Sequence, residues 1–316
     1  MKLGRHESKI MGENMGSDQL CATYENVVTG HPPIPLPPPP SPSLAGPPGD
    51  HNRSTNVFDV RTFGAVGGGG ADNTEAFKMV WDAACSSQVE SPVLYVPSGY
   101  SFMVQSTIFT GPCQGGIVFQ VNSELMPPDG PESWPKGLSR RQWLVFYQVI
   151  GMSLQGDGLI DRKGEKWRDL PCKPHKEGNG TSLPGPCDSP IVSYKVLHEL
   201  QLNSACAQKR NSPQFHFRFD NCRNVHIDSI FLSAPLGPNA DGIHIENTIG
   251  VKIYNSVISN GDDCVSIGSG CYNVYVWNIT CGPSHGIRFN SHNVFLKHAS
   301  MFIFSSNWCI INIYTN

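Results

Sequence analysis

The sequence lacks long apolar runs and is poor in charged residues. No stretch is long and apolar enough to cross a membrane as a helix, which takes about 20 apolar residues, so we expect no membrane partner. Asp, Glu, Lys and Arg make up 16% of the chain, and the formal net charge of −3 does not favour a nucleic-acid-binding protein. Low charge with abundant Asn, Ser, Gly and β-branched residues instead favours a β-rich extracellular protein.

The sequence predicts neither a signal peptide nor a nucleotide-binding loop. Residues 1–30 contain no apolar core of about seven or more residues, so they do not read as a signal peptide. The glycine run at residues 67–70 is followed by neither Gly-Lys-Ser/Thr nor a G-x-G-x-x-G pattern in a parallel unit. We therefore do not predict nucleotide binding.

Short β-like runs recur at a regular spacing between residues 225 and 289. Three of them begin at Gly242, Cys264 and Gly286, which are 22 positions apart each time. Companion runs lie before and between them and begin at Val225, Val251 and Val274. Such a period, with one or two strands per unit, is typical of a stacked and coiled β architecture.

The residues that precede the three runs are Asp241, Asp263 and His285. If the repeats stack as rungs, equivalent positions lie about 4.8 Å apart, so these side chains form one column with Asp262 beside it. Asp residues often merely fill turns, but two adjacent unpaired charges gain nothing from that role. Neighbouring carboxylates raise at least one pKa, which gives the proton donor and acceptor that cleavage of a glycosidic bond needs.

The pair Asp262–Asp263 poses a geometric condition. Successive side chains of a strand point to opposite faces, so these two carboxylates share a cleft only if they lie in a turn or a bulge. We therefore expect a break in the strand at this point.

The sequence resembles the polygalacturonases of glycoside hydrolase family 28. The boxes NAD (239–241), GDDC (261–264) and SHG (284–286) are similar to the N-T-D, G-D-D and G-H-G boxes of that family. The flanking sequence also resembles plant members of the family, over about 59–192 and 211–288. The segments that carry this resemblance are PESWPKG, GMSLQGDGLID, LPGPCDSP and NSPQFHFRFDNC. The resemblance implies an all-β, right-handed parallel β-helix that hydrolyses α-1,4-galacturonan with inversion.

The resemblance also implies a role for each site residue. Asp262 is similar to the general acid, and Asp241 and Asp263 to the pair that activates water. His285 is similar to the residue that tunes the protonation of the acid, and Asn239 to a substrate-binding residue. This scheme calls for no metal ion and no other cofactor, and its partner is pectin or polygalacturonate bound by a monomer.

The cysteines and the sequons bear on the compartment. The chain has eleven cysteines, an odd number, of which Cys172 and Cys187 are placed as one pair. The resemblance implies a disulfide between Cys264 and Cys281 beside the acid residues, and buried thiols are the alternative. Sequons at Asn52, Asn179 and Asn278 agree with a glycoprotein. The family implies an extracellular protein of the cell wall, although no signal peptide is visible.

The chain divides into unequal parts. We expect a Pro-rich, disordered segment over 1–56 and the β-helix domain over 57–288, with a helix at about 74–85, capped by Asn73 or Thr74, that shields its N-terminal end. Residues 192–210 interrupt the strand pattern, and their sequence is partly typical of a helix. Residues 289–316 form a divergent tail.

The tail carries the main departure from the family. It lacks the Arg-Ile-Lys box and the later Tyr that follow in polygalacturonases, and the period predicts about three or four further rungs. The chain thus resembles a C-terminally truncated member, in which Arg288 and Lys297 are expected to be surface charges.

Two other functions are open. One is an inactive, pectin-binding or non-functional product that lacks the cationic box. The other is a pectate lyase, which is also a β-helix but needs Ca²⁺ and an Arg base. Activity that is indifferent to a chelator would exclude the lyase.

Overall fold

The structure, a computed structural model, describes residues 56–135, 142–168, 191–195, 198–203, 208–210, 215–234, 240–289 and 301–302, with only the backbone for 168, 191–210 and 301–302. The chain separates into Met1–Arg53 and Ser54–Asn316, and every described element belongs to the second unit. The predicted domain boundaries at residues 56 and 288 stay predictions.

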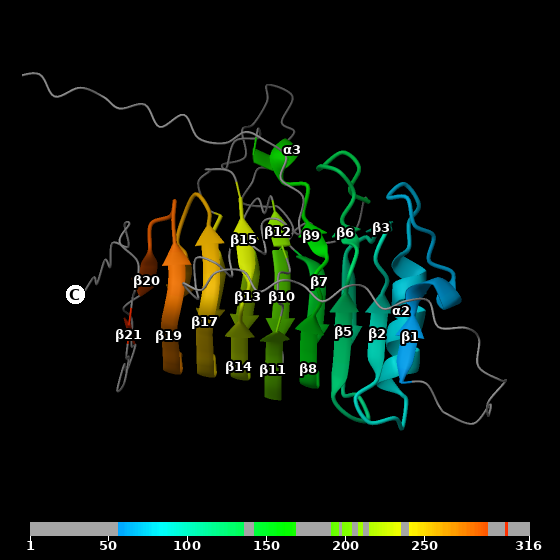
Figure 1. Cartoon of the computed structure of the whole chain (residues 1–316), viewed down its shortest axis with the longest axis horizontal. Helices are drawn as coiled ribbons and strands as arrows, with labels where there is room; N and C mark the ends of the chain where they lie inside the picture. The colour runs from blue at the N-terminus through cyan, green and yellow to red at the C-terminus, as the bar shows by residue number, and fades with distance from the viewer. Residues whose placement is uncertain are drawn as a thin grey trace, which may run out of the picture. The chain divides into compact units, whose positions relative to one another are not determined.

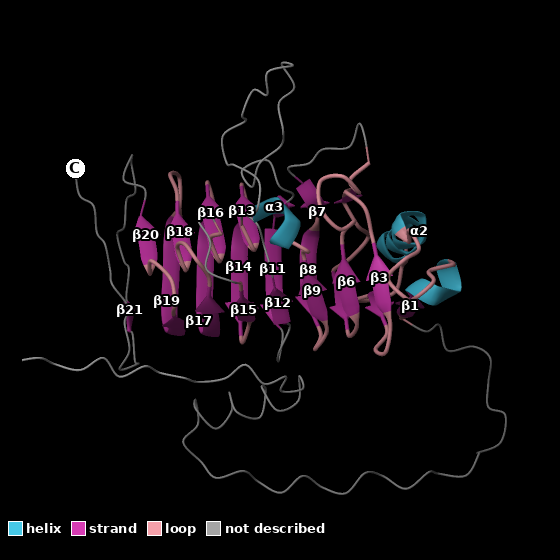
Figure 2. Ribbon diagram, turned by 90° about the horizontal axis from the view of Figure 1, so that it is seen from above, coloured by secondary structure: helices cyan, strands magenta, loops and turns pink. Residues whose placement is uncertain are grey.

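The second unit is a right-handed parallel β-helix, and every pairing between its described strands is parallel (Figures 1 and 2). The 14-stranded sheet runs through β1 (Val57–Asp59), β2 (Val93–Val96), β5 (Ile117–Val121), β8 (Ile150–Gln155), β11 (His198–Asn203), β14 (Arg223–Asp228) and β17 (Ile249–Ser259). It returns through β15 (Phe231–Ser233), β12 (Gln208–Arg210), β9 (Leu159–Asp161), β6 (Glu124–Met126) and β3 (Ser101–Met103), and β19 (Tyr272–Cys281) and β21 (Met301–Phe302) continue from β17.

The second sheet has seven strands, and the candidate site described below lies on its outer face. In spatial order it contains β20 (Ile287–Phe289), β18 (Val265–Ile267), β16 (Ile243–Glu246), β13 (Phe217–Asp220), β10 (Ile191–Lys195), β7 (Gln142–Tyr147) and β4 (Thr107–Thr110). The remaining elements are η1 (Val60–Phe63), α2 (Thr74–Cys85) and α3 (Glu165–Arg168). No helix among the described residues is long and apolar enough to cross a membrane.

The predicted period is confirmed by the strand register. Ile243 pairs with Val265, and Val265 pairs with Ile287, so the spacing of 22 residues is one full turn of the helix at each step. All three side chains are buried, whereas the next residues in β16 and β20, His244 and Arg288, are half-buried and exposed. Each rung therefore adds one apolar residue to an inner stack, which gives a continuous core along the helix axis.

The long strands turn a corner at asparagines. Asn255 in β17 and Asn278 in β19 have φ near 50°, a left-handed conformation that Asn tolerates better than most residues. The Asn278 side-chain amide donates to Asn255 Oδ1 (2.6 Å), and the Asn255 amide donates to Asp228 Oδ1 (3.0 Å). A glycan on the predicted acceptor Asn278 would therefore have to replace a hydrogen bond of this ladder.

Helix α2 closes the N-terminal end of the β-helix, as expected (Figure 1). Its buried face includes Phe77 and Trp81, which pack against Phe102 and Phe109 of the first rungs. The Trp81 indole also donates to the Thr110 carbonyl (3.1 Å), so the helix satisfies polar as well as apolar groups at this edge.

The helix begins at the predicted N-cap residue, but the side chain of that residue does not cap it. Asn73 occupies the N-cap position, but its side-chain oxygen accepts from the Val66 N–H (2.6 Å) and not from the helix. The Asp72 carboxylate accepts from the Thr74 N–H (3.0 Å) in its place. At its other end, α2 is tied to the loop before β5 by a disulfide that the sequence did not predict, Cys85–Cys113.

The expectation of a partly helical insert over 192–210 is wrong. This segment contributes β10, β11 and β12, and each pairs with the rungs on both sides. Leu200 and Leu202 lie in register with the buried Val225 and Ile227 of β14. Neighbouring rungs offer open hydrogen-bonding edges on both sides, and this outweighs the weak local preference of the segment for a strand.

Candidate active site

A bend between β17 and β18 places the two adjacent carboxylates. Asp262 and Asp263 lie outside both strands. The two side chains can therefore share a face, as the predicted break in the strand requires. The Asn260 side chain is fully buried beneath the bend, and its amide donates to the carbonyls of Ala240 (2.6 Å) and Asp263 (2.8 Å). The Asp263 N–H in turn donates to Asp262 Oδ1 (2.9 Å), so the bend is held at both residues.

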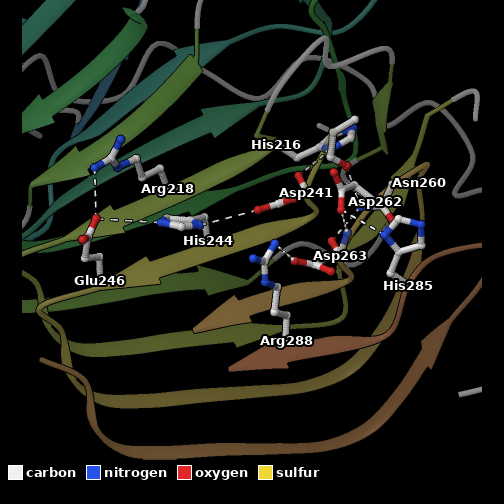
Figure 3. Close-up of polar contacts among 11 residues, drawn as sticks. His216, Arg218, Asp241, His244, Glu246, Asn260, Asp262, Asp263, His285 and Arg288 are labelled. Carbon is white, nitrogen blue, oxygen red and sulfur yellow. Dashed lines mark hydrogen bonds and ion pairs between the residues drawn. The ribbon is translucent and has the colours of Figure 1, made fainter. Parts of the chain in front are cut away.

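The predicted column is built by backbone hydrogen bonds between rungs. The Gly242 N–H donates to the Asp263 carbonyl (2.8 Å), and the His285 N–H donates to the Asp262 carbonyl (2.9 Å). Figure 3 shows the side chains of Asp241, Asp262 and Asp263 gathered together with His285 at the edge of the group. A Cβ on Gly242 would lie 2.5 Å from the Cys264 carbonyl oxygen, so only glycine permits this close approach.

The electrostatics single out Asp263. Its side chain is buried beside Asp241, which is buried too. Burial is the largest cause that raises the pKa of Asp263 to about 6, followed by the charges of Asp241 and Asp262. The charges of Arg288 and His285 oppose this rise. The cluster therefore contains a carboxyl that is partly protonated in mildly acidic solution.

His285 contacts Asp262 rather than Asp263. Its Nδ1 lies 3.1 Å from Asp262 Oδ1, within hydrogen-bonding distance, and two thirds (66%) of its side chain is exposed. One ligand atom from each of Asp262, Asp263 and His285 lies within 4.8 Å of the other two, so these three are the described residues that together could hold a metal ion. That the chemistry needs no metal stays a prediction.

The outer face of the second sheet adds two residues that the sequence did not single out. His244 Nδ1 lies 3.6 Å from Asp241 Oδ2, and His244 Nε2 lies 3.8 Å from Glu246 Oε2. The available signal was the alternation of β16, because residues 244 and 246 face outward when 243 and 245 are buried.

Arg288 is exposed, as we expected of a surface charge, but it also contacts the cluster. Its Nη1 lies 3.6 Å from Asp263 Oδ2, so it belongs to the candidate site (Figure 3). Lys297 and the predicted substrate-binding Asn239 fall outside the described residues.

The disulfide expected next to the site is present. Cys264, the residue after Asp263, is bonded to Cys281 at the end of β19. The bond links two successive rungs next to the bend that carries Asp262 and Asp263. Cys271 is a buried free thiol, Cys222 is buried, and Cys172 and Cys187 lie outside the described residues.

A column of carboxylates on a parallel β-helix invites comparison with known glycosidases. The family model described as "Glycosyl hydrolases family 28" matches residues 85–293. The chain belongs to this family. The resemblance of its three boxes is therefore confirmed at the level of the family.

Curated relatives in this family are plant polygalacturonases. The chain is 37% identical over 245 residues to "Polygalacturonase" of Cryptomeria japonica, covering 77% of this chain and 46% of the relative. It is 34% identical over 265 residues to "Polygalacturonase" of Persea americana, covering 84% of this chain and 54% of the relative. The chain thus spans about half the length of the curated relatives it matches.

Solved structures support the fold alone, because their sequences are distant. The exopolygalacturonase of Thermotoga maritima superposes with a TM-score of 0.57 at 20% identity, over 86% of this chain and 67% of that chain. The polygalacturonase of Erwinia carotovora superposes with a TM-score of 0.53 at 16% identity, over 79% of this chain and 74% of that chain.

Proposed function

We propose that this member of family 28 hydrolyses α-1,4-galacturonosidic bonds in polygalacturonan, the unesterified form of pectin. The observation that carries the proposal is the gathering of Asp241, Asp262 and Asp263 with His285 on one outer face of the β-helix. The curated relatives named above are polygalacturonases, and this agrees with the substrate.

In the proposed reaction, Asp262 is the general acid that protonates the leaving glycosidic oxygen. Its side chain is the most exposed of the three carboxylates and its Oδ1 lies 3.1 Å from His285 Nδ1, so it is placed to exchange a proton with the solvent. His285 is proposed as the residue that tunes the acid, because its Nδ1 lies 3.1 Å from Asp262 Oδ1.

Asp241 and Asp263 are proposed to activate the water. Both are buried, and the charge of Asp241 helps to raise the pKa of Asp263. A water held between them would lose its proton to an ionised carboxylate as it attacks the anomeric carbon. Asn239 is proposed to bind the substrate.

Inversion is part of the proposal on the strength of the family resemblance. One carboxylate oxygen of Asp262 and one of Asp263 lie within 4.8 Å of each other. Inverting glycosidases commonly separate the two carboxyls by about 6.5–9.5 Å, so this pair leaves less space for water than usual. We therefore propose that Asp241, on the neighbouring rung, is needed to position the water.

Activity is expected to fall in acid because the base must be ionised. Asp263 takes up a proton as the pH drops through its pKa of about 6, and it then no longer accepts one from water. We expect kcat/KM on polygalacturonate to decrease about tenfold per pH unit below about pH 6. Rates at pH 4–8 measure this, and a kcat/KM that stays flat down to pH 4 would remove Asp263 from the role of base.

The proposed setting is the plant cell wall, outside the cell. Two disulfides among the described residues, Cys85–Cys113 and Cys264–Cys281, agree with an oxidising compartment. We further propose that the protein acts as a monomer on pectin. The release of reducing ends from polygalacturonate by the wild-type chain and an Asp262 variant is the direct test of the function.

A further inference from the structure

Arg288 lies on the outer face of the β-helix, three positions after His285. In β20, Ile287 is buried and Arg288 is exposed, as the alternation of a strand requires. The register places Arg288 next to Ser266, and Ser266 next to His244. The guanidinium therefore belongs to a row that runs along the helix axis directly beside the carboxylates.

Arg288 keeps unused hydrogen-bonding capacity within the described part of the chain. Its contact with Asp263, at 3.6 Å, is longer than a hydrogen bond, and its side chain is 54% exposed. Among the described residues it makes no side-chain hydrogen bond, whereas a guanidinium has five N–H donors in a planar fork. Arg218, two rungs from Ser266 in the same row, differs because Glu246 (3.1 Å) and Asp220 (3.7 Å) already hold it.

The charge of the site makes this cation important. Asp241, Asp262 and Asp263 form a concentrated negative region, and an anionic sugar that approached it would be repelled. Arg288 is the cation that contacts this region within the part of the chain that the structure describes. A planar guanidinium matches a carboxylate with two parallel hydrogen bonds, which a neutral ester cannot reproduce.

We propose that Arg288 binds the carboxylate of a uronic acid unit adjoining the bond to be cleaved, and that it makes the site prefer free uronates to their methyl esters. The inference rests on the proposed function for the identity of the sugar. It does not rest on turnover, because recognition of the carboxylate precedes any chemistry.

Equilibrium binding tests this role separately from hydrolysis. The probes are trigalacturonate and its fully methyl-esterified form, titrated calorimetrically into the full chain at low salt and a temperature at which turnover is slow. The variants are Arg288→Gln, Arg288→Lys and the matched control Arg218→Gln, which removes a guanidinium that two carboxylates already occupy. Circular dichroism and the Tm of each variant verify that the fold is unchanged.

We expect Arg288→Gln to weaken trigalacturonate binding about 10- to 100-fold, the usual effect of a lost charge-assisted pair, and to change binding of the methyl ester less than threefold. Lysine should restore part of the affinity, since it keeps the charge without the fork. Arg218→Gln should change the Kd for either ligand less than threefold.

Three results would overturn the inference: unchanged binding of trigalacturonate to Arg288→Gln, an equal loss for both ligands, or no binding of either ligand to the wild-type chain. If the expected pattern appears in a chain that releases no reducing ends, the hydrolysis proposal fails and the role of Arg288 stands.

Discussion

Replacing Asp262 with Asn should lower the rate of polygalacturonate hydrolysis about 1,000-fold, within the range of about 10²–10⁴ for a lost general acid. Asparagine has nearly the same shape but carries no transferable proton. Its side-chain oxygen still accepts from the Asp263 N–H, which donates to Asp262 Oδ1 at 2.9 Å in the wild-type chain. The bend should therefore persist while the proton donor is lost.

Asp220→Asn is the matched control for this experiment. It also removes one carboxylate, but Asp220 lies in β13 and pairs with Arg218 (3.7 Å) away from the cluster. Release of reducing ends should change less than threefold in this control. Similar rates for Asp262→Asn and Asp220→Asn, with both chains folded, would show that Asp262 is not the acid.

Asp263→Asn should abolish activity and at the same time stabilise the protein at neutral pH. In the folded chain the pKa of Asp263 is raised from the ordinary 3.8 to about 6 by burial and by the two neighbouring carboxylates. A raised pKa means that this group favours folding below its unfolded pKa and loses that contribution as the pH rises through about 6. At pH 7 the ionised Asp263 is therefore a cost, and a neutral amide removes it.

The expected gain is about 1–2 kcal/mol, because nearby solvent screens part of the cost. This corresponds to a rise in Tm of about 3–6 °C for a domain of this size. Differential scanning calorimetry at pH 4 and pH 7.5 measures the effect. The Tm difference should grow between these values, because the wild-type carboxyl is mostly neutral in the folded state at pH 4.

Asp220→Asn again supplies the comparison, since it loses an ion pair and should not raise the Tm at either pH. A lower Tm for Asp263→Asn at pH 7.5 would mean that the carboxylate is held by favourable contacts. Such a result would contradict the electrostatic cost assigned to Asp263. It would also contradict the decrease of kcat/KM expected below about pH 6.

Much of this site could be predicted from the sequence because a β-helix converts a sequence period into a stack. Each rung pairs in register with the next, so residues 22 positions apart, such as Asp241 and Asp263, are bound to be neighbours. The need for a turn at Asp262 follows from the alternation of side chains along a strand. Both expectations depend only on local geometry.

Other features depend on where side chains point after folding. The contact of Arg288 with Asp263 needs the guanidinium to extend back across one rung, and no period specifies this. The Cys85–Cys113 bond depends on how the end of α2 meets the loop before β5. The strands of 191–210 form because their neighbours supply pairing edges, so the weak local pattern was a poor guide there.

The most direct test of the central claim is proton NMR of trigalacturonate during the first minutes of digestion by the wild-type chain. The account predicts new reducing ends that appear first as the β-anomer, in the presence or absence of a chelator, with no unsaturated product. Early α-anomer would contradict inversion by the carboxylate cluster. An unsaturated product, or no new reducing ends from a folded and soluble chain, would contradict hydrolysis itself and favour a lyase or a non-catalytic protein.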